Sequence, residues 1–195
     1  AIQLMMNYLD QNPATGIVGP KVLNPDGSFQ EHCKRGEARP WEVFCYFSRL
    51  SRLFPHNPHF AGYLQGHLDE NHVHHVPAIS GCCMLIRKEV IDQIGYLDEL
   101  FFAYQEDSDY CKRARAAGWK VTYYPLAQII HFGGKGGARA QPYRAILEWH
   151  RSYYHYYRKH FALDYFFVFN YFIYLLMVLK LGWAMLINLI RSEKY

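Results

Sequence analysis

The sequence predicts an α/β fold, a mixed sheet with helices, followed by C-terminal hydrophobic helices. Over the first two thirds, short apolar runs bounded by Gly, Pro and Asn alternate with segments of helical spacing. Near the end, residues 165–190 hold a single charge, Lys180. The chain has 195 residues, of which 51% are hydrophobic. That apolar content excludes a disordered, collagen-like or coiled-coil chain.

The first third predicts a helix, a buried strand and a hairpin. Residues 1–11 have the apolar spacing of a short helix, which Pro13 and Gly16 end. Residues 16–23 form an apolar run typical of a buried strand, and Asn-Pro-Asp-Gly follows as a turn. We expect residues 28–35 to return as the second strand of that hairpin.

Residues 36–76 have a weaker pattern. An aromatic helix is expected over 41–54, followed by a loop that leads into the next strand. A long irregular segment of this kind often holds a partner or a substrate.

The middle of the chain is clearer. Residues 78–86 form an apolar run, expected to be a strand in which Gly81 marks a close backbone approach. A short helix is expected over 87–95 and a second over 106–118, with acids in its first turn as the helix dipole favours. Two strands, 119–125 and 126–131, then lead to a Gly-rich loop.

The positive charge is confined to the last third. Residues 1–138 carry 13 Lys and Arg against 14 Asp and Glu, whereas residues 139–195 carry 8 against 3. Residues 139–160 are basic and aromatic with helical spacing, and they precede the apolar block. As one helix, that block of 26 residues would be about 39 Å long, enough to cross a hydrocarbon core of roughly 30 Å. A membrane partner is therefore expected rather than a nucleic acid, although a buried hairpin is the alternative.

Five cysteines without CxxC spacing suggest reduced thiols in the cytosol. Because the chain begins with Ala in a helical pattern, we expect the natural protein to begin further upstream.

Three features carry candidate chemistry. Ser80 and Gly81 come first, the acids Glu106, Asp107 and Asp109 follow, and His131 lies after a strand. A carboxylate at such a site can act as a general base towards a hydroxyl, and a His can bind a metal. Taken alone, the acids are better explained by helix-terminal charge, and His131 by a hydrogen-bonded structural role.

The pattern G-x-x-M-L-I-R-K-E-V-x-D-x-I-G-Y-L-D-E-x-F-F-x-Y-x-E-D-x-D-Y-C-x-R, continued by A-G-W-K-V-x-Y-x-P-x-A-x-I-x-H, resembles the acceptor-side half of family 2 glycosyltransferases. Among them it looks most like the rhamnosyltransferase-type enzymes of bacterial surface polysaccharide synthesis. The resemblance covers about residues 12–160. It implies an incomplete GT-A-type α/β fold and an inverting transfer, in which an acceptor hydroxyl attacks the anomeric carbon of a nucleotide-diphospho-sugar.

The resemblance also implies roles for single residues. Asp107 falls on the family's base, with Glu106 as the runner-up, and His131 falls on the residue that helps to hold Mg²⁺ or Mn²⁺ on the diphosphate. The remaining candidates are expected to contact the substrates, and they are Gly81, Asp109, Lys135 and Arg139.

The nucleotide-binding half of the family, with its DxD motif, has no counterpart in this sequence. We therefore expect residues 1–138 to be a partial catalytic domain and residues 139–195 to be a membrane-associating segment. The expected partners are the nucleotide-sugar donor, a glycan or lipid-linked acceptor, the membrane and the missing N-terminal half. The expected location is the cytoplasmic face of a bacterial inner membrane. The alternative is a non-catalytic, membrane-anchored module derived from such a transferase.

Overall fold

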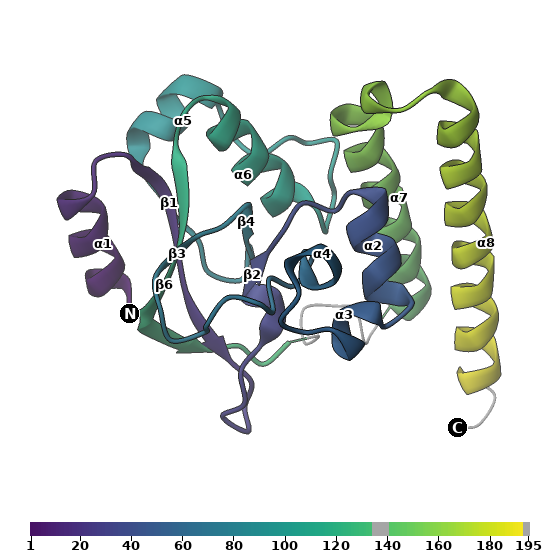
Figure 1. Cartoon of the computed structure of the whole chain (residues 1–195), viewed down its shortest axis with the longest axis horizontal. Coiled ribbons are helices and arrows are strands. Elements are labelled where there is room, and N and C mark those ends of the chain that lie inside the picture. The colour runs from purple at the N-terminus through teal and green to yellow at the C-terminus, as the bar shows by residue number, and fades with distance from the viewer. Residues whose placement is uncertain (134–140, 193–195) are drawn as a thin grey trace. The chain divides into compact units, whose positions relative to one another are not determined.

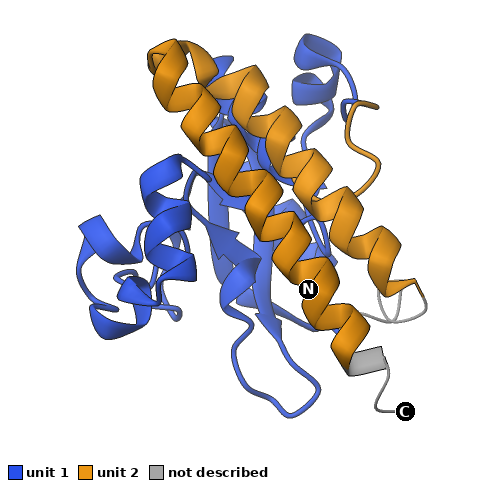
Figure 2. Cartoon of the chain, turned by 90° about the vertical axis from the view of Figure 1, so that its right-hand side faces the viewer, with its two compact units in different colours: residues 1–98, 107–132 blue, residues 99–106, 133–195 orange. Residues whose placement is uncertain are grey.

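The computed structural model describes residues 1–133 and 141–192. The chain forms two compact units, shown in different colours in Figure 2. Unit 1 comprises residues 1–98 and 107–132, and unit 2 comprises residues 99–106 and 133–195.

Unit 1 is built on a four-stranded mixed sheet in the order β3-β6-β1-β5 (Figure 1). The central strand β1 pairs with β6 in parallel and with β5 antiparallel, and β3 pairs antiparallel with β6. The mixed α/β class expected from the sequence is confirmed. The strands of this sheet are β1 (Thr15–Leu23), β3 (His74–His75), β5 (Leu85–Ile86) and β6 (Lys120–Ile130).

Helices cover both faces of β1. Consecutive side chains of a strand point to opposite faces, so Ile17 and Val18 enter different clusters. Val18 packs with Met5 and Leu9 of α1 (Ile2–Gln11). Ile17 belongs to a second cluster with Val90 of α5 and Tyr110 of α6. The ranges of these two helices are Lys88–Ile94 for α5 and Glu106–Ala116 for α6.

The expected hairpin after β1 is wrong beyond its turn. The turn exists, since Gly27 donates to the Asn24 carbonyl at 2.9 Å. The returning chain pairs with β1 through the Leu23–Phe29 bridge and the Gln30 N–H, which donates to the Val22 carbonyl at 2.9 Å. The chain then passes through a 3-10 turn, η1 (Glu31–Cys33), into β2 (Lys34–Arg35). Strand β2 pairs with β4 (Ala78–Ile79) instead of β1 and forms a separate two-stranded sheet.

Two further strand predictions need correction. The expected strand 78–86 is broken by a turn that begins at Gly81, which leaves β4 and β5 as separate strands. The two strands expected after Gly118 are a single strand, β6. Its register against β1 shifts between Pro20 and Lys21, which pair with Tyr124 and Gln128. Pro125 lies in this bulge, where the pairing of the two strands is interrupted. Its lack of a backbone N–H therefore costs no hydrogen bond between the strands.

The helix expected over 41–54 is divided into two short helices, and a third short helix lies in the segment that was expected to be a loop. The first ends at Ser48, whose hydroxyl donates to the Phe44 carbonyl at 2.7 Å, and Arg49 then takes a left-handed backbone with φ of 64°. The helices are α2 (Pro40–Phe47), α3 (Leu50–Leu53) and α4 (Pro58–Ala61).

Unit 2 contains a helical hairpin formed by α7 (Pro142–His160) and α8 (Phe167–Ser192), joined through the 3-10 turn η2 (Ala162–Asp164). The two helices lie side by side and run antiparallel (Figures 1 and 2). Both were expected from the sequence. Within the described residues, α8 is the one helix long and apolar enough to cross a membrane, over Phe167–Ile190.

Candidate functional site

The acidic motif lies where a loop enters α6. Tyr104 and Gln105 precede the helix with left-handed backbones, at φ of 65° and 62°. Such conformations are unfavourable for residues other than Gly and occur often at functional sites. They turn the chain so that Glu106 begins the helix and Asp107 follows within its first turn.

The carboxylate of Asp107 is surrounded by donors from three parts of unit 1. Its Oδ2 atom accepts from the Gly81 backbone N–H at 2.8 Å and lies 2.5 Å from Nη2 of Arg35. Its Oδ1 atom accepts from the Ser108 backbone N–H at 2.6 Å and from the Ser108 hydroxyl at 3.2 Å. Gly81 and Asp107, which were both predicted as site residues, are therefore in direct contact.

Arg35 was not predicted from the sequence. It comes from β2, and its contact with Asp107 joins residues 72 positions apart, so no local pattern marks it. Burial alone would raise the pKa of Asp107, but the guanidinium and the N–H donors outweigh it and hold that pKa below its ordinary value. Burial likewise opposes the charge of Arg35, whose pKa is nevertheless raised by Asp107. Both groups are therefore ionised at neutral pH.

This geometry defines how Asp107 can act. Asp107 is 7% exposed. Its Oδ1 accepts two hydrogen bonds from Ser108, and its Oδ2 accepts one from Gly81 and forms the ion pair with Arg35. The weakest of these contacts is the Ser108 hydroxyl, which can rotate away. An acceptor hydroxyl that replaces it would reach Oδ1 while Arg35 and Gly81 keep Oδ2 in place.

The neighbouring acids occupy different environments. Glu106 is half-buried at the start of α6. Asp109 is fully buried and accepts from Nε of Arg113 at 2.8 Å. That guanidinium also donates to the carbonyls of Ile94 and Tyr96, which anchors α6 to the end of α5. The predicted substrate contact of Asp109 stays a prediction beside this structural role.

His131 follows the last residue of β6. Its backbone N–H donates to Leu23, and its Nδ1 lies 2.9 Å from Oε1 of Gln30. These bonds place it with the residues after β1 rather than with the Asp107 cluster. Within residues 1–133 and 141–192, no group of three or more His, Cys, Asp or Glu is placed to hold a metal ion. The donor set is thus too small to form a metal site from these residues. Lys135 and Arg139 lie outside the described residues.

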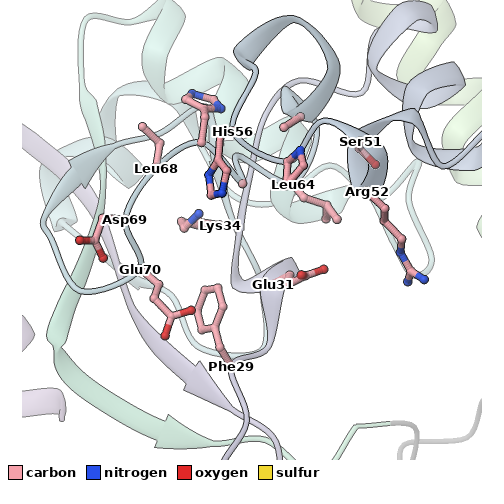
Figure 3. A pocket seen from close by; sticks show the side chains of 14 residues that line it. Phe29, Glu31, Lys34, Ser51, Arg52, His56, Leu64, Leu68, Asp69 and Glu70 are labelled. Atoms are coloured by element: carbon pink, nitrogen blue, oxygen red, sulfur yellow. The ribbon is translucent and has the colours of Figure 1, made fainter.

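A cavity of about 670 Å³ lies in the segment that the sequence suggested as a ligand-holding region. Figure 3 shows Lys34 near its centre, with Phe29, Glu31 and Glu70 around it. The Lys34 Nζ donates to the Gln65 carbonyl at 2.7 Å, and burial lowers its pKa. Because Lys34 and Arg35 are consecutive in β2, the cavity and Asp107 lie on opposite sides of that strand. The acidic and basic side chains that line the cavity suit a polar, hydroxyl-bearing ligand.

Parts of the sequence match known proteins. Residues 60–152 match the model of "Glycosyltransferase like family 2". The chain is 29% identical over 160 residues to a Mycobacterium tuberculosis protein named N-acetylglucosaminyl-diphospho-decaprenol L-rhamnosyltransferase. This match covers 79% of this chain and 49% of that protein. It is 37% identical over 62 residues to a hexosyltransferase of low-salt glycan biosynthesis from Haloferax volcanii, which covers 32% of this chain and 20% of that protein.

The chain spans about half the length of the Mycobacterium tuberculosis relative. The mixed α/β architecture agrees with the GT-A-like fold expected of family 2, and the family match includes both Gly81 and the acidic motif at 106–109. By these matches the chain is similar to family 2 glycosyltransferases and, among them, to rhamnosyltransferases.

Proposed function

We propose that this chain is the acceptor-side part of an inverting glycosyltransferase. The enzyme would move a sugar from a nucleotide-diphospho-sugar to a hydroxyl of a glycan or lipid-linked acceptor in cell-surface polysaccharide synthesis. Rhamnose is the candidate sugar, because the Mycobacterium tuberculosis relative is named as a rhamnosyltransferase that acts on a lipid-linked acceptor. The observation that carries the proposal is the buried Asp107 carboxylate, held in place by Arg35 and Gly81 within the matched region.

In this mechanism Asp107 is the general base. An acceptor hydroxyl takes the place of the Ser108 hydroxyl at Oδ1 and passes its proton to the carboxylate as its oxygen bonds to the anomeric carbon. The bond from that carbon to the diphosphate breaks, and the nucleoside diphosphate leaves with the bonding electrons. Arg35 keeps the base ionised and oriented, at the expense of its basicity. Glu106 is the runner-up for the base.

The donor side of the reaction is proposed to come from an N-terminal nucleotide-binding half. A divalent cation, Mg²⁺ or Mn²⁺, would neutralise the diphosphate when bound. His131 remains a single proposed ligand, because the described residues do not form a complete metal site. Lys135 and Arg139 are proposed to meet the diphosphate.

The proposed location is the cytoplasmic face of a bacterial inner membrane, where lipid-linked acceptors would be presented. The apolar helix α8 supports membrane association. We propose residues 1–138 as the partial catalytic domain and residues 139–195 as the membrane-associating segment.

The test is sugar transfer by membranes that contain the complete gene product. They are incubated with radiolabelled nucleotide-diphospho-rhamnose and a polyprenyl-diphosphate-linked acceptor, and label is measured in the lipid fraction. We expect rhamnose to be transferred in a cation-dependent manner, with other nucleotide sugars as the specificity controls. Failure of every donor to label any acceptor would favour the alternative, a non-catalytic membrane module.

A further inference from the structure

Two polar residues of α8, Asn170 and Lys180, contact residues of α7. Asn170 accepts from the Tyr157 hydroxyl at 2.5 Å and donates to the Ala162 carbonyl at 2.8 Å. Lys180 lies 3.1 Å from Nε2 of His150, with its Nζ 4.0 Å from the ring centre of Trp149. The one charge that interrupts the apolar block is thus inside the hairpin.

The opposite side of α8 forms a continuous apolar face, called here the outward sector. Its residues are exposed in unit 2 and fall on one side of a helix at 100° per residue. A face of this size on a helix is typical of a protein or membrane contact. The sector consists of uncharged residues, namely Tyr171, Phe172, Leu175, Leu176, Val178, Leu179, Gly182, Trp183, Leu186 and Ile190.

A line of arginines runs along α7 beside this helix. Arg144, Arg151 and Arg158, called here the basic stripe, are all exposed and recur at spacings of seven. Arg158 donates to the Tyr154 hydroxyl at 3.1 Å, and the Tyr154 ring packs 5.2 Å from that of Tyr174 on α8. The stripe therefore borders the side of α7 that contacts α8.

The pairing of the two helices fixes the level of each arginine along α8. Tyr157 contacts Asn170, Tyr154 contacts Tyr174, and His150 contacts Lys180. Arg158 therefore lies level with about residue 170, and Arg151 level with about residue 180. Arg144 lies six residues beyond His150 in sequence, about 9 Å further along the helix axis.

A membrane-spanning α8 would take the basic stripe into the bilayer with it. The stripe extends over about 21 Å beside the middle of the apolar segment, whereas the hydrocarbon core is about 30 Å thick. Arg151 would then lie near the bilayer centre, too far from either headgroup layer for its side chain to reach. A helix lying parallel to the membrane surface avoids this, because every arginine then stays at the same shallow depth.

We propose that the α7–α8 hairpin lies in the plane of one leaflet of an anionic phospholipid bilayer, and that α8 does not cross the membrane. The outward sector enters the acyl region, and the basic stripe meets lipid phosphates. This inference rests on the proposed membrane association of the chain but not on the proposed sugar transfer.

The first experiment measures depth along α8. A fluorescent non-canonical amino acid replaces residue 172, 179, 186 or 190 of the full chain, one at a time, all within the outward sector. The protein is bound to phosphatidylglycerol-containing vesicles that carry a nitroxide quencher at a shallow or a deep acyl position. We expect the shallow quencher to dominate at all four positions, with the same ratio of shallow to deep quenching.

Two outcomes would overturn the proposal. Deep quenching at residue 179 with shallow quenching at residue 190 would show a helix that crosses the bilayer. Quenching at none of the four positions, with the chain dimeric in sedimentation, would show that a second copy covers the sector. Sugar transfer by the complete gene product to a water-soluble acceptor analogue, measured in parallel, separates either failure from a failure of the proposed function.

The second experiment tests the lipid charge. The Arg151→Gln, Arg158→Gln double variant removes two charges from the basic stripe, and the Lys88→Gln, Lys120→Gln double variant removes two exposed charges from unit 1. We expect the first to bind anionic vesicles about 10- to 30-fold more weakly in co-sedimentation, since each basic residue near such a surface contributes about fivefold. The control should retain its affinity, and equal losses in both variants would contradict a specific role for the stripe.

Discussion

Unit 1 and the α7–α8 hairpin place their polar side chains according to different surroundings. In unit 1 two acids of α6 are buried and paired, Asp107 with Arg35 and Asp109 with Arg113, and apolar side chains fill the clusters on either side of β1. In the hairpin, Lys180 and Asn170 face inwards and the apolar outward sector is exposed. The first pattern suits a fold in water, and the second suits a helix in contact with lipid.

Buried polar groups therefore have different roles in the two units. Ion pairs inside unit 1 are removed from water and position a reactive group, so losing one partner leaves an uncompensated charge. In the proposed membrane contact, the polar contacts inside the hairpin would keep the charge of Lys180 away from lipid, and the outward sector of α8 carries no charge. Similar substitutions should therefore change the stability of the two units in opposite directions.

The largest effect is expected for Arg35→Leu. This change leaves the Asp107 carboxylate buried without its cation, which should lower the free energy of unfolding by about 3–5 kcal/mol. Urea unfolding of the chain in mild detergent measures it. The Arg115→Leu variant is the control, because Arg115 pairs with Glu37 at an exposed position, and it should lose less than about 1 kcal/mol.

The double variant Arg35→Leu, Asp107→Asn sharpens this prediction. Removing both charges should restore much of the stability lost in Arg35→Leu, because the penalty comes from the unpaired carboxylate. Additive losses in the double variant would show that the two side chains do not act as a pair.

A matched pair of glycines compares the two units directly. A Cβ added to Gly19 of β1 would lie 2.1 Å from Cγ2 of Ile79, whereas one added to Gly182 of α8 meets nothing within 4 Å. Gly19→Ala should destabilise unit 1 by about 1–3 kcal/mol through overpacking. Gly182→Ala should stabilise α8 by about 0.5–1 kcal/mol through helix propensity.

Hydrogen exchange resolved by peptide measures both effects in one protein. Protection should fall in β1 for Gly19→Ala and rise slightly in α8 for Gly182→Ala. A fall in protection in both segments would show that Gly182 is closely packed, like a residue in the core of a soluble protein.

An effect that depends on pH is expected at Glu37, which accepts from Lys112, Arg115 and Arg39 at 2.9 to 3.1 Å. Burial raises the pKa of Glu37, but these cations outweigh it and lower the pKa to about 2. Because the folded pKa lies below the unfolded one, Glu37 stabilises the fold above about pH 4.5, and this contribution disappears as the pH falls towards 2.

Glu37→Gln should therefore cost about 1–2 kcal/mol at pH 7, after allowance for solvent screening of its partly exposed cations. Its stability should converge with that of the unaltered chain near pH 2. Urea unfolding at several pH values measures the difference, and a constant gap across that range would argue against the titration of Glu37 as its cause.

The sequence predicted the elements whose pattern is local. The apolar run of β1, the acid-to-base order along α6 and the apolar block of α8 each mark one element within a single segment. The same local residues placed Gly81 and Asp107 in one candidate site through the family resemblance, and the structure shows them in contact.

The remaining features depend on contacts between distant segments. Strands β2 and β4 are two residues long, too short for any alternation to show, so their pairing was replaced by an incorrect hairpin. Arg35 was missed because its significance lies in one carboxylate 72 positions away. Pro125 suggested two strands, although a bulge lets one strand contain it. The inward position of Lys180 was equally invisible, because it follows from the contact with α7.

The role of Asp107 as the acceptor base is tested most directly by transfer with Asp107→Asn in the complete gene product. We expect kcat for sugar transfer to fall about 10²- to 10⁴-fold, the usual contribution of a general base, while the Kd of the nucleotide-sugar donor hardly changes. Glu106→Gln serves as the comparison at the neighbouring carboxylate and should lose far less. Retained turnover in Asp107→Asn, with transfer lost in Glu106→Gln, would contradict the assignment of Asp107 as the base.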